Sequence, residues 1–308
     1  FSSPGAIEIA SGATFQKSGG FTNSGTIGGT GTVDVGTDYT LTNTGTLRPG
    51  ASSGDTTGTL SITGNLSNSG SVNTELGGTT SGDYDVLTVS GAATLGGTLN
   101  VTETNGFLTS KNNTFTVLTA GTKTGNFSTF NYPEDVAFNT DASGAKNLIL
   151  TAGAISTHWN TDASGNWATA ANWSRGIPTA SIDNVVISRS SADPTVTISS
   201  GSYTVSAFTC DDSLSITGGA LTVNGTSTIN NLSLSGGTLA GSGDVSLAGA
   251  NTWSGGTIGV GYGGSGSVTL LSGNSLSLSG SGVKYLDGGK LIIADGGAAE
   301  WTGGNLTP

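Results

Sequence analysis

The sequence predicts an all-β fold in which short strands stack as successive rungs of a solenoid. A six-residue pattern, apolar–Ser/Thr–x–Gly–x–apolar, recurs seven times in the last third of the chain, with variations in three copies. Apolar and polar residues alternate over runs of three to five residues interrupted by Gly, Asn or Asp, which is typical of short strands. No segment of a dozen residues keeps the 3.6-residue period of a helix.

The repeat in the last third is too short to form an independent domain. Its copies start 15 to 19 residues apart, at Ile198, Ile216, Leu234, Trp253, Leu271, Leu286 and Trp301. A unit of this length cannot bury its own apolar face, so we expect each copy to be one rung stacked on the next. Alternation points the apolar side chains inward, and the glycine allows the positive φ of a corner.

The first half of the chain has a repeat of its own. Three near copies of an apolar–Ser/Thr–Asn–Ser/Thr–Gly motif lie within 21–27, 41–47 and 66–72. Asn23, Asn43 and Asn68 are equivalent residues of these copies. Asparagine tolerates corners and its amide can hydrogen-bond along a stack, so we expect these three side chains to lie above one another.

The chain is predicted to contain two stacked or tandem solenoid modules, residues 1–154 and 155–308. The period becomes unclear near 107–152, where we expect an irregular segment. The second module starts with a Trp-rich cap or junction, residues 155–184, that holds Trp159, Trp167 and Trp173. These three residues are candidates either for covering the end of the solenoid or for stacking against a glycan.

Composition excludes several classes of partner. The 308 residues include 53 Gly and no Met, only 9% are charged, and the net charge is −11. A nucleic-acid-binding protein or an anionic-membrane binder needs a basic surface, which this balance does not supply. Cys210 is the single cysteine, and no stretch of 18 apolar residues predicts a membrane span. Because the chain begins without Met, we expect a processed product or a segment of a longer protein.

Few residues are candidates for chemistry, and we predict no catalytic residue and no cofactor. His158 is the single histidine, and we expect it to have a packing or surface role. Calcium prefers several carboxylate and carbonyl oxygens. Two close pairs of carboxylates are therefore weak candidates for a structural Ca²⁺ ion: Asp83 with Asp85, and Asp211 with Asp212.

Three stretches carry a resemblance to known bacterial proteins: 45–66, which contains Gly-Thr-Leu-Arg-Pro-Gly, the Leu/Thr/Gly run of 83–99, and the Trp-rich 159–178. They resemble surface proteins of the autotransporter-passenger and filamentous-haemagglutinin-like type. The first two stretches are similar to the repeats near the end of such passengers, and the third is similar to modules in large secreted bacterial repeat proteins. The resemblance implies a right-handed parallel β-helix on the bacterial cell surface. It carries over no catalytic residue.

The sequence therefore favours a non-enzymatic extracellular protein, a structural or adhesive rod or filament segment of a bacterial surface or secreted protein. The alternative is a β-helix that binds or processes a carbohydrate, with Trp159, Trp167 and Trp173 as glycan contacts. Expected partners are another copy stacked end to end or the continuation of a longer chain. A surface glycan or a receptor on a host or neighbouring cell is the other expected partner.

Overall fold

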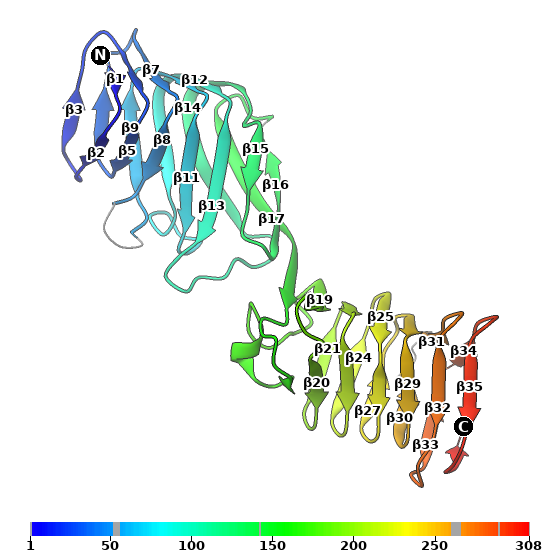
Figure 1. Ribbon diagram of the computed structural model, residues 1–308. Helices are drawn as coiled ribbons and strands as arrows, with labels where there is room; N and C mark the ends of the chain where they lie inside the picture. The colour runs from blue at the N-terminus through cyan, green and yellow to red at the C-terminus, as the bar shows by residue number, and fades with distance from the viewer. Residues whose placement is uncertain (1, 52–55, 142, 260–265, 289, 308) are drawn as a thin grey trace. The chain divides into compact units, whose positions relative to one another are not determined.

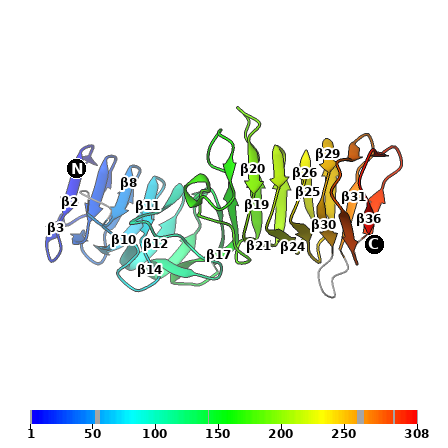
Figure 2. The ribbon, with the colours of Figure 1, turned by 90° about the horizontal axis from the view of Figure 1, so that it is seen from below.

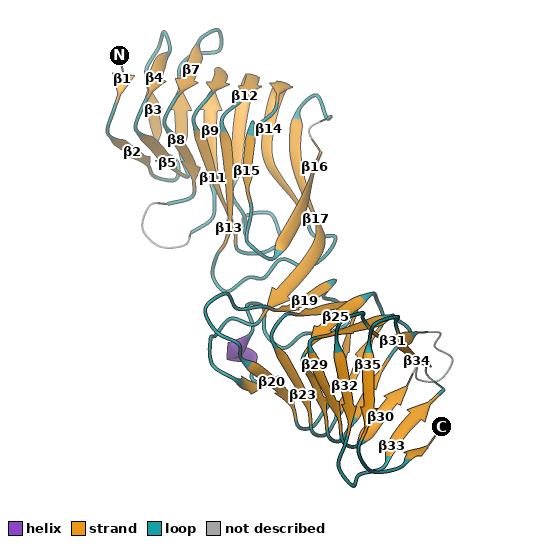
Figure 3. Ribbon diagram, turned by 45° about the vertical axis from the view of Figure 1, so that its right-hand side comes forward, coloured by secondary structure: helices purple, strands orange, loops and turns teal. Residues whose placement is uncertain are grey.

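The computed structural model describes residues 2–51, 56–141, 143–259, 266–288 and 290–307. Strands dominate this part of the chain, and its one helical element is a single 3-10 turn, η1 (Ala170–Asn172) (Figure 3). The chain divides into two compact units, Phe1–Gly153 and Ala154–Pro308, where the sequence had placed the boundary after residue 154. Each unit has a hydrophobic core of its own.

The first unit is built from three series of parallel strands (Figure 1). One series consists of β2 (Ala6–Ile9), β5 (Thr26–Gly29), β8 (Thr46–Pro49), β11 (Ser71–Leu76), β13 (Thr98–Glu103) and β15 (Thr129–Asn131). The second consists of β1 (Ser2–Ser3), β4 (Phe21–Asn23), β7 (Thr40–Asn43), β10 (Asn65–Asn68) and the second halves of β12 (Val86–Leu95) and β14 (Thr114–Gly125). The third consists of β3 (Thr14–Gln16), β6 (Thr32–Asp34), β9 (Thr59–Thr63) and the first halves of β12 and β14.

The core of the first unit is made of rows that run from strand to strand. In one row Ile27, Leu47, Val72 and Leu99 are direct partners on successive strands, and all four are buried. Along each strand, the residues next to these core residues are less buried. In Ser71–Leu76, for example, buried and partly buried residues alternate. Alternation of apolar and polar residues thus directs one face of each strand inward.

The expected stack of asparagines in the first unit is confirmed. The side-chain amide of Asn23 donates to Oδ1 of Asn43 (2.7 Å), and that of Asn43 donates to Oδ1 of Asn68 (2.7 Å). The amide of Asn68 then donates to the carbonyl oxygen of Gly96 (2.7 Å). The three side chains are 0 to 4% exposed, so the hydrogen bonds satisfy polar groups that water does not reach.

Parallel pairing in the first unit continues further than the sequence indicated. Residues 118–125 of β14 pair with β12, and β15 pairs with β13, within the stretch 107–152 that was expected to be irregular. Backbone hydrogen bonds maintain this register although the apolar period is lost there. The parallel pairing ends at β17 (Asn147–His158), which follows β16 (Val136–Asp141) in the chain. The first residues of β17 pair with β14 in antiparallel orientation.

The second unit also consists of three parallel series of strands (Figure 2). The β17–β34 ladder contains the end of β17, β19 (Asn184–Ile187), β22 (Ala207–Cys210), β25 (Ser227–Asn230), β28 (Val245–Ala248), β31 (Ser267–Leu270) and β34 (Lys290–Ile293). The β18–β35 ladder contains β18 (Gly165–Asn166), β20 (Thr195–Ile198), β23 (Ser213–Ile216), β26 (Leu232–Leu234), β29 (Ala250–Trp253), β32 (Ser275–Leu278) and β35 (Ala298–Trp301). The β21–β36 ladder contains β21 (Ser202–Val205), β24 (Ala220–Val223), β27 (Thr238–Ala240), β30 (Gly256–Gly259), β33 (Lys284–Asp287) and β36 (Leu306–Thr307).

From β19 onward each strand of the second unit pairs with the strand three places later in the chain. This order, with parallel pairing throughout, is compatible with a β-solenoid. Before β27, Gly237 has φ +67°, and a Cβ there would lie 2.4 Å from the carbonyl oxygen of Gly219, which precedes β24. Only glycine permits both this conformation and this close approach.

The register corrects two members of the predicted repeat. Ile198, Ile216, Leu234 and Trp253 are direct partners in the β18–β35 ladder, as the repeat predicts, but the next partner is Leu278 and not Leu271. Leu271 lies outside the strands, and Leu286 pairs with Ile258 in the β21–β36 ladder. The segment from Trp253 to Leu278 is longer than the segments between the earlier partners. Because the short degenerate motif also recurs in other strands, the sequence pattern alone assigns the wrong residue to this position.

Candidate functional site

Three tryptophans lie against the first strands of the second unit. The main-chain amides of Trp159 and Trp167 donate to the carbonyls of Val186 in β19 (2.9 Å) and Thr197 in β20 (2.9 Å). The ring centroid of Trp173 lies 5.1 Å from that of Trp159 and 4.8 Å from that of Trp167, in edge-to-face arrangements. The three rings form one aromatic cluster that belongs to the core of this unit.

The burial of the three indole rings determines whether a ligand can contact them. Trp159 and Trp167 are 0% exposed and Trp173 is 3% exposed. The indole nitrogens of Trp159 and Trp173 donate to the main-chain carbonyls of Ala163 (3.2 Å) and Trp167 (2.9 Å). Stacking against a sugar requires an open ring face, which none of these three side chains presents, whereas covering the end of an apolar core requires burial.

The carboxylates of Asp83 and Asp85 do not converge. Both residues precede β12, Asp83 is exposed, and Asp85 is fully buried. The two carboxylate oxygens of Asp85 accept hydrogen bonds from the main-chain amides of Gly58 (2.8 Å) and Glu75 (2.9 Å). Burial raises the pKa of Asp85 to about 7, although both amides act to lower it. Asp85 therefore fastens the residues around Gly58 to β11.

Asp211 and Asp212 also have different surroundings. Asp211 is exposed, whereas Asp212 is 4% exposed and its carboxylate accepts a hydrogen bond from the main-chain amide of Arg189 (2.9 Å). Burial raises the pKa of Asp212, and the carboxylates of Asp193 and Asp211 act in the same direction. The side chain of Arg189 in turn donates to Asp162 (2.8 Å), so this corner is held by hydrogen bonds within the chain.

The described ranges hold no cluster of three or more His, Cys, Asp or Glu residues arranged for a metal ion. His158 is partly buried in β17, where its main-chain amide donates to the hydroxyl of Ser174 (3.0 Å).

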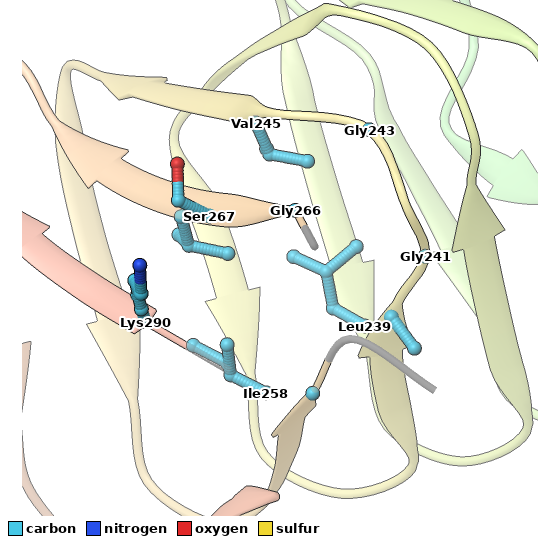
Figure 4. Close-up of a pocket in the computed structure, with 11 residues that line it drawn as sticks. Leu239, Gly241, Gly243, Val245, Ile258, Gly266, Ser267 and Lys290 are labelled. Carbon is cyan, nitrogen blue, oxygen red and sulfur yellow. The ribbon is translucent and has the colours of Figure 1, made fainter. Parts of the chain in front are cut away.

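A small hollow lies inside the second unit, between the β17–β34 and β21–β36 ladders. Figure 4 shows the side chains of Leu239, Val245 and Ile258 around it, with Lys290 at its side. Its volume is about 10 Å³, which is room for about one water molecule. A small-molecule site needs some hundreds of Å³, so this hollow is a gap in the packing.

A larger depression lies on the outer face of the β21–β36 ladder. It has a volume of about 320 Å³ and is lined by Thr257, Tyr285, Asp287 and Thr307. The sequence motifs do not predict a site at these residues. The available signal was the alternation in 284–287: Leu286 packs against the core, so Tyr285 and Asp287 on either side of it must face outward.

Comparison of the chain with models of protein families, with curated proteins and with solved structures gives no match. The resemblance to bacterial surface proteins therefore stays a prediction from the residues. The described part of the chain has no helix with the length and hydropathy of a membrane span.

Proposed function

We propose that each unit is a closed right-handed β-solenoid and that the chain is a rod or filament segment of a bacterial cell-surface or secreted protein, with a structural or adhesive and non-enzymatic role. The observation that carries this proposal is the in-register pairing of strands in the second unit. Seven strands follow one another in the β18–β35 ladder. At about 4.8 Å per strand, such a ladder extends about 30 Å along its axis.

The outer surface of the ladders also supports a structural role. In the outward column on the β18–β35 ladder, five hydroxyl residues are direct partners in register and Glu300 follows them: Thr197, Ser215, Ser233, Thr252 and Ser277. Hydroxyl groups thus provide the solvated surface of a chain in which only 9% of residues are charged. A hydroxyl-rich surface with few charged residues and a single cysteine fit the proposed extracellular location.

The last strands support an end-to-end contact. Trp301 and Ile293 follow Leu278 and Leu270 in their core columns, and they are 52% and 40% exposed. Exposed apolar residues in core columns favour association with another apolar surface. We propose that a second copy of the chain provides this surface.

Negative-stain electron microscopy of the full chain tests the proposal. We expect elongated segments of uniform width, and rods that lengthen with protein concentration if the last rung binds another copy. Trp301→Asp should shorten the rods and leave the segment width unchanged, because it places a charge in the exposed core column. Compact particles without an elongated segment would contradict the rod, and release of reducing ends from polysaccharides by the wild-type protein would contradict the non-enzymatic role.

The second candidate function, carbohydrate processing or binding at the three tryptophans, loses its proposed contact surface because these rings are buried. An aromatic residue elsewhere on the second unit provides the open ring face that they lack.

A further inference from the structure

We propose that the depression at Tyr285, on the outer face of the β21–β36 ladder, is a binding site for a neutral saccharide. The proposed rod depends on inward-facing side chains and on strand pairing. The residues of this site face outward, so saccharide binding is an additional property of the second unit.

The register places an aromatic ring between two small side chains. Thr257 in β30, Tyr285 in β33 and Thr307 in β36 are direct partners on three adjacent strands. Tyr285 is 46% exposed. Threonine is much shorter than tyrosine, so the phenol ring stands above both neighbours. Backbone pairing with β30 and β36 holds the ring on this face of the sheet.

A carboxylate lies on the same face, two residues further along β33. Asp287 is exposed, and its partner on β30 is Gly259, which has no side chain. A Cβ built at Gly259 would lie 3.0 Å from the main-chain oxygen of Asp287 and 3.5 Å from its Cβ, so a larger residue at this position would crowd Asp287. Together these residues border the depression of about 320 Å³, near the lower end of the range for small-ligand sites.

The chemistry of these groups matches a pyranose ring. One face of such a sugar carries C–H groups that can lie on the tyrosine ring, and its edge carries hydroxyl groups. The carboxylate of Asp287 accepts hydrogen bonds from hydroxyls, and the hydroxyls of Thr257 and Thr307 can donate or accept them. Asp287 and the net charge of −11 disfavour an anionic ligand.

An extended peptide fits this place less well. Peptides that add to a sheet use free backbone groups at an edge. The depression instead lies on the face of the sheet, and its central residue, Tyr285, is paired on both sides, with Thr257 and Thr307. Recognition here must use side chains, which favours a sugar with a ring face and hydroxyl groups.

Isothermal titration calorimetry of the full chain against four neutral hexasaccharides tests the site: maltohexaose, cellohexaose, laminarihexaose and chitohexaose. We expect saturable binding of at least one of them. Tyr285→Ala should weaken it roughly tenfold or more, because the stacking surface is lost. Asp287→Asn should weaken it less, and Tyr285→Phe should preserve most of it. Tyr39→Ala is the matched control, since Tyr39 is an equally exposed tyrosine (51%) in the first unit.

The proposal is overturned if none of the four sugars binds at about 10 mM, a concentration that would reveal even millimolar affinity. It is also overturned if Tyr285→Ala binds as tightly as wild type, or if hexagalacturonate binds more tightly than the neutral sugars. Far-UV circular dichroism checks that each variant keeps its strands. Electron microscopy reports on the rod separately, so loss of binding with intact elongated segments rejects the saccharide site alone.

Discussion

At the scale of single residues, the polar side chains with the strongest structural role are buried and bonded to the backbone or to one another. Asp85 holds two main-chain amides, and Asn43 links the asparagines of neighbouring rungs. Each is a polar group removed from water, which costs free energy unless its hydrogen bonds are made. Their contributions can be measured one residue at a time.

Asp85 should make stability depend on pH. Its pKa is raised to about 7 in the folded protein, from an ordinary value of 3.8, so the folded state holds the proton more tightly than the unfolded chain does. Its contribution to stability is therefore fully present below about pH 4 and is lost as the pH rises through 7, by up to about 4 kcal/mol in total. Residue 85 cannot titrate in Asp85→Asn. The melting temperature of this variant, relative to that of wild type, should therefore be higher at pH 8 than at pH 4.

Asp83→Asn is the matched control for this titration, because Asp83 is exposed and lies two residues away. Its difference in melting temperature from wild type should stay nearly constant over the same pH range. A constant difference for Asp85→Asn as well would show that the buried carboxyl does not titrate between the two values.

Asn43→Ala should destabilise the first unit by about 2 kcal/mol, because it leaves the side-chain oxygen of Asn68 buried without this partner. It also removes the shortest hydrogen bond of the Asn23 side-chain amide, which keeps those to the carbonyls of Gly25 and Thr46 (3.2 Å each). Asn100→Ala is the matched control. Asn100 bonds Asn73 (2.8 Å) and Asn131 (2.7 Å) in a similar column on the outer face, where water can replace it. We expect a loss below about 1 kcal/mol there by urea denaturation, and equal losses would contradict the importance of burial.

At the scale of elements, the parallel strands are supported by contacts between their connections, where the backbone of one connection approaches that of another. The carbonyl oxygen of Gly219 accepts a hydrogen bond from the amide of Thr238 (2.9 Å), directly after Gly237. That carbonyl group occupies the space that a side chain of residue 237 would need. A side chain at this position must displace the backbone of Gly218 and Gly219.

Gly237→Ala should therefore cost about 3 kcal/mol, the sum of the strain of positive φ and the displacement of the Gly219 carbonyl. Gly273→Ala is the control, because Gly273 also has positive φ (+76°) but a Cβ there meets nothing within 4 Å. That variant should lose only about 1 kcal/mol. Similar losses in chemical denaturation of the two variants would mean that close approach at the corner contributes nothing.

At the scale of the whole molecule, the chain has two compact units with separate cores. The five tryptophans, Trp159, Trp167, Trp173, Trp253 and Trp301, all belong to the second unit. Tryptophan fluorescence consequently reports unfolding of the second unit, whereas far-UV circular dichroism reports both. The asparagine column lies entirely in the first unit.

Asn43→Ala should therefore move only part of the unfolding transition. We expect its circular-dichroism curve in urea to show an earlier first phase, while the fluorescence midpoint stays at the wild-type value, because each core unfolds as its own cooperative unit. Gly237→Ala should have the opposite effect and shift the fluorescence midpoint. Equal shifts of both signals in both variants would show that the units unfold as one.

The sequence alone determined the all-β class, the inward and outward faces of the strands and the asparagine column, because alternation and short repeats are local properties of the chain. Only the tertiary structure decided which residue follows Trp253 in its core column, that the tryptophan rings are buried, and that β17 pairs with β14 in antiparallel orientation. Register and burial depend on the length of each turn and on what packs against it. A degenerate six-residue motif carries neither, which is why Leu278 takes the place predicted for Leu271.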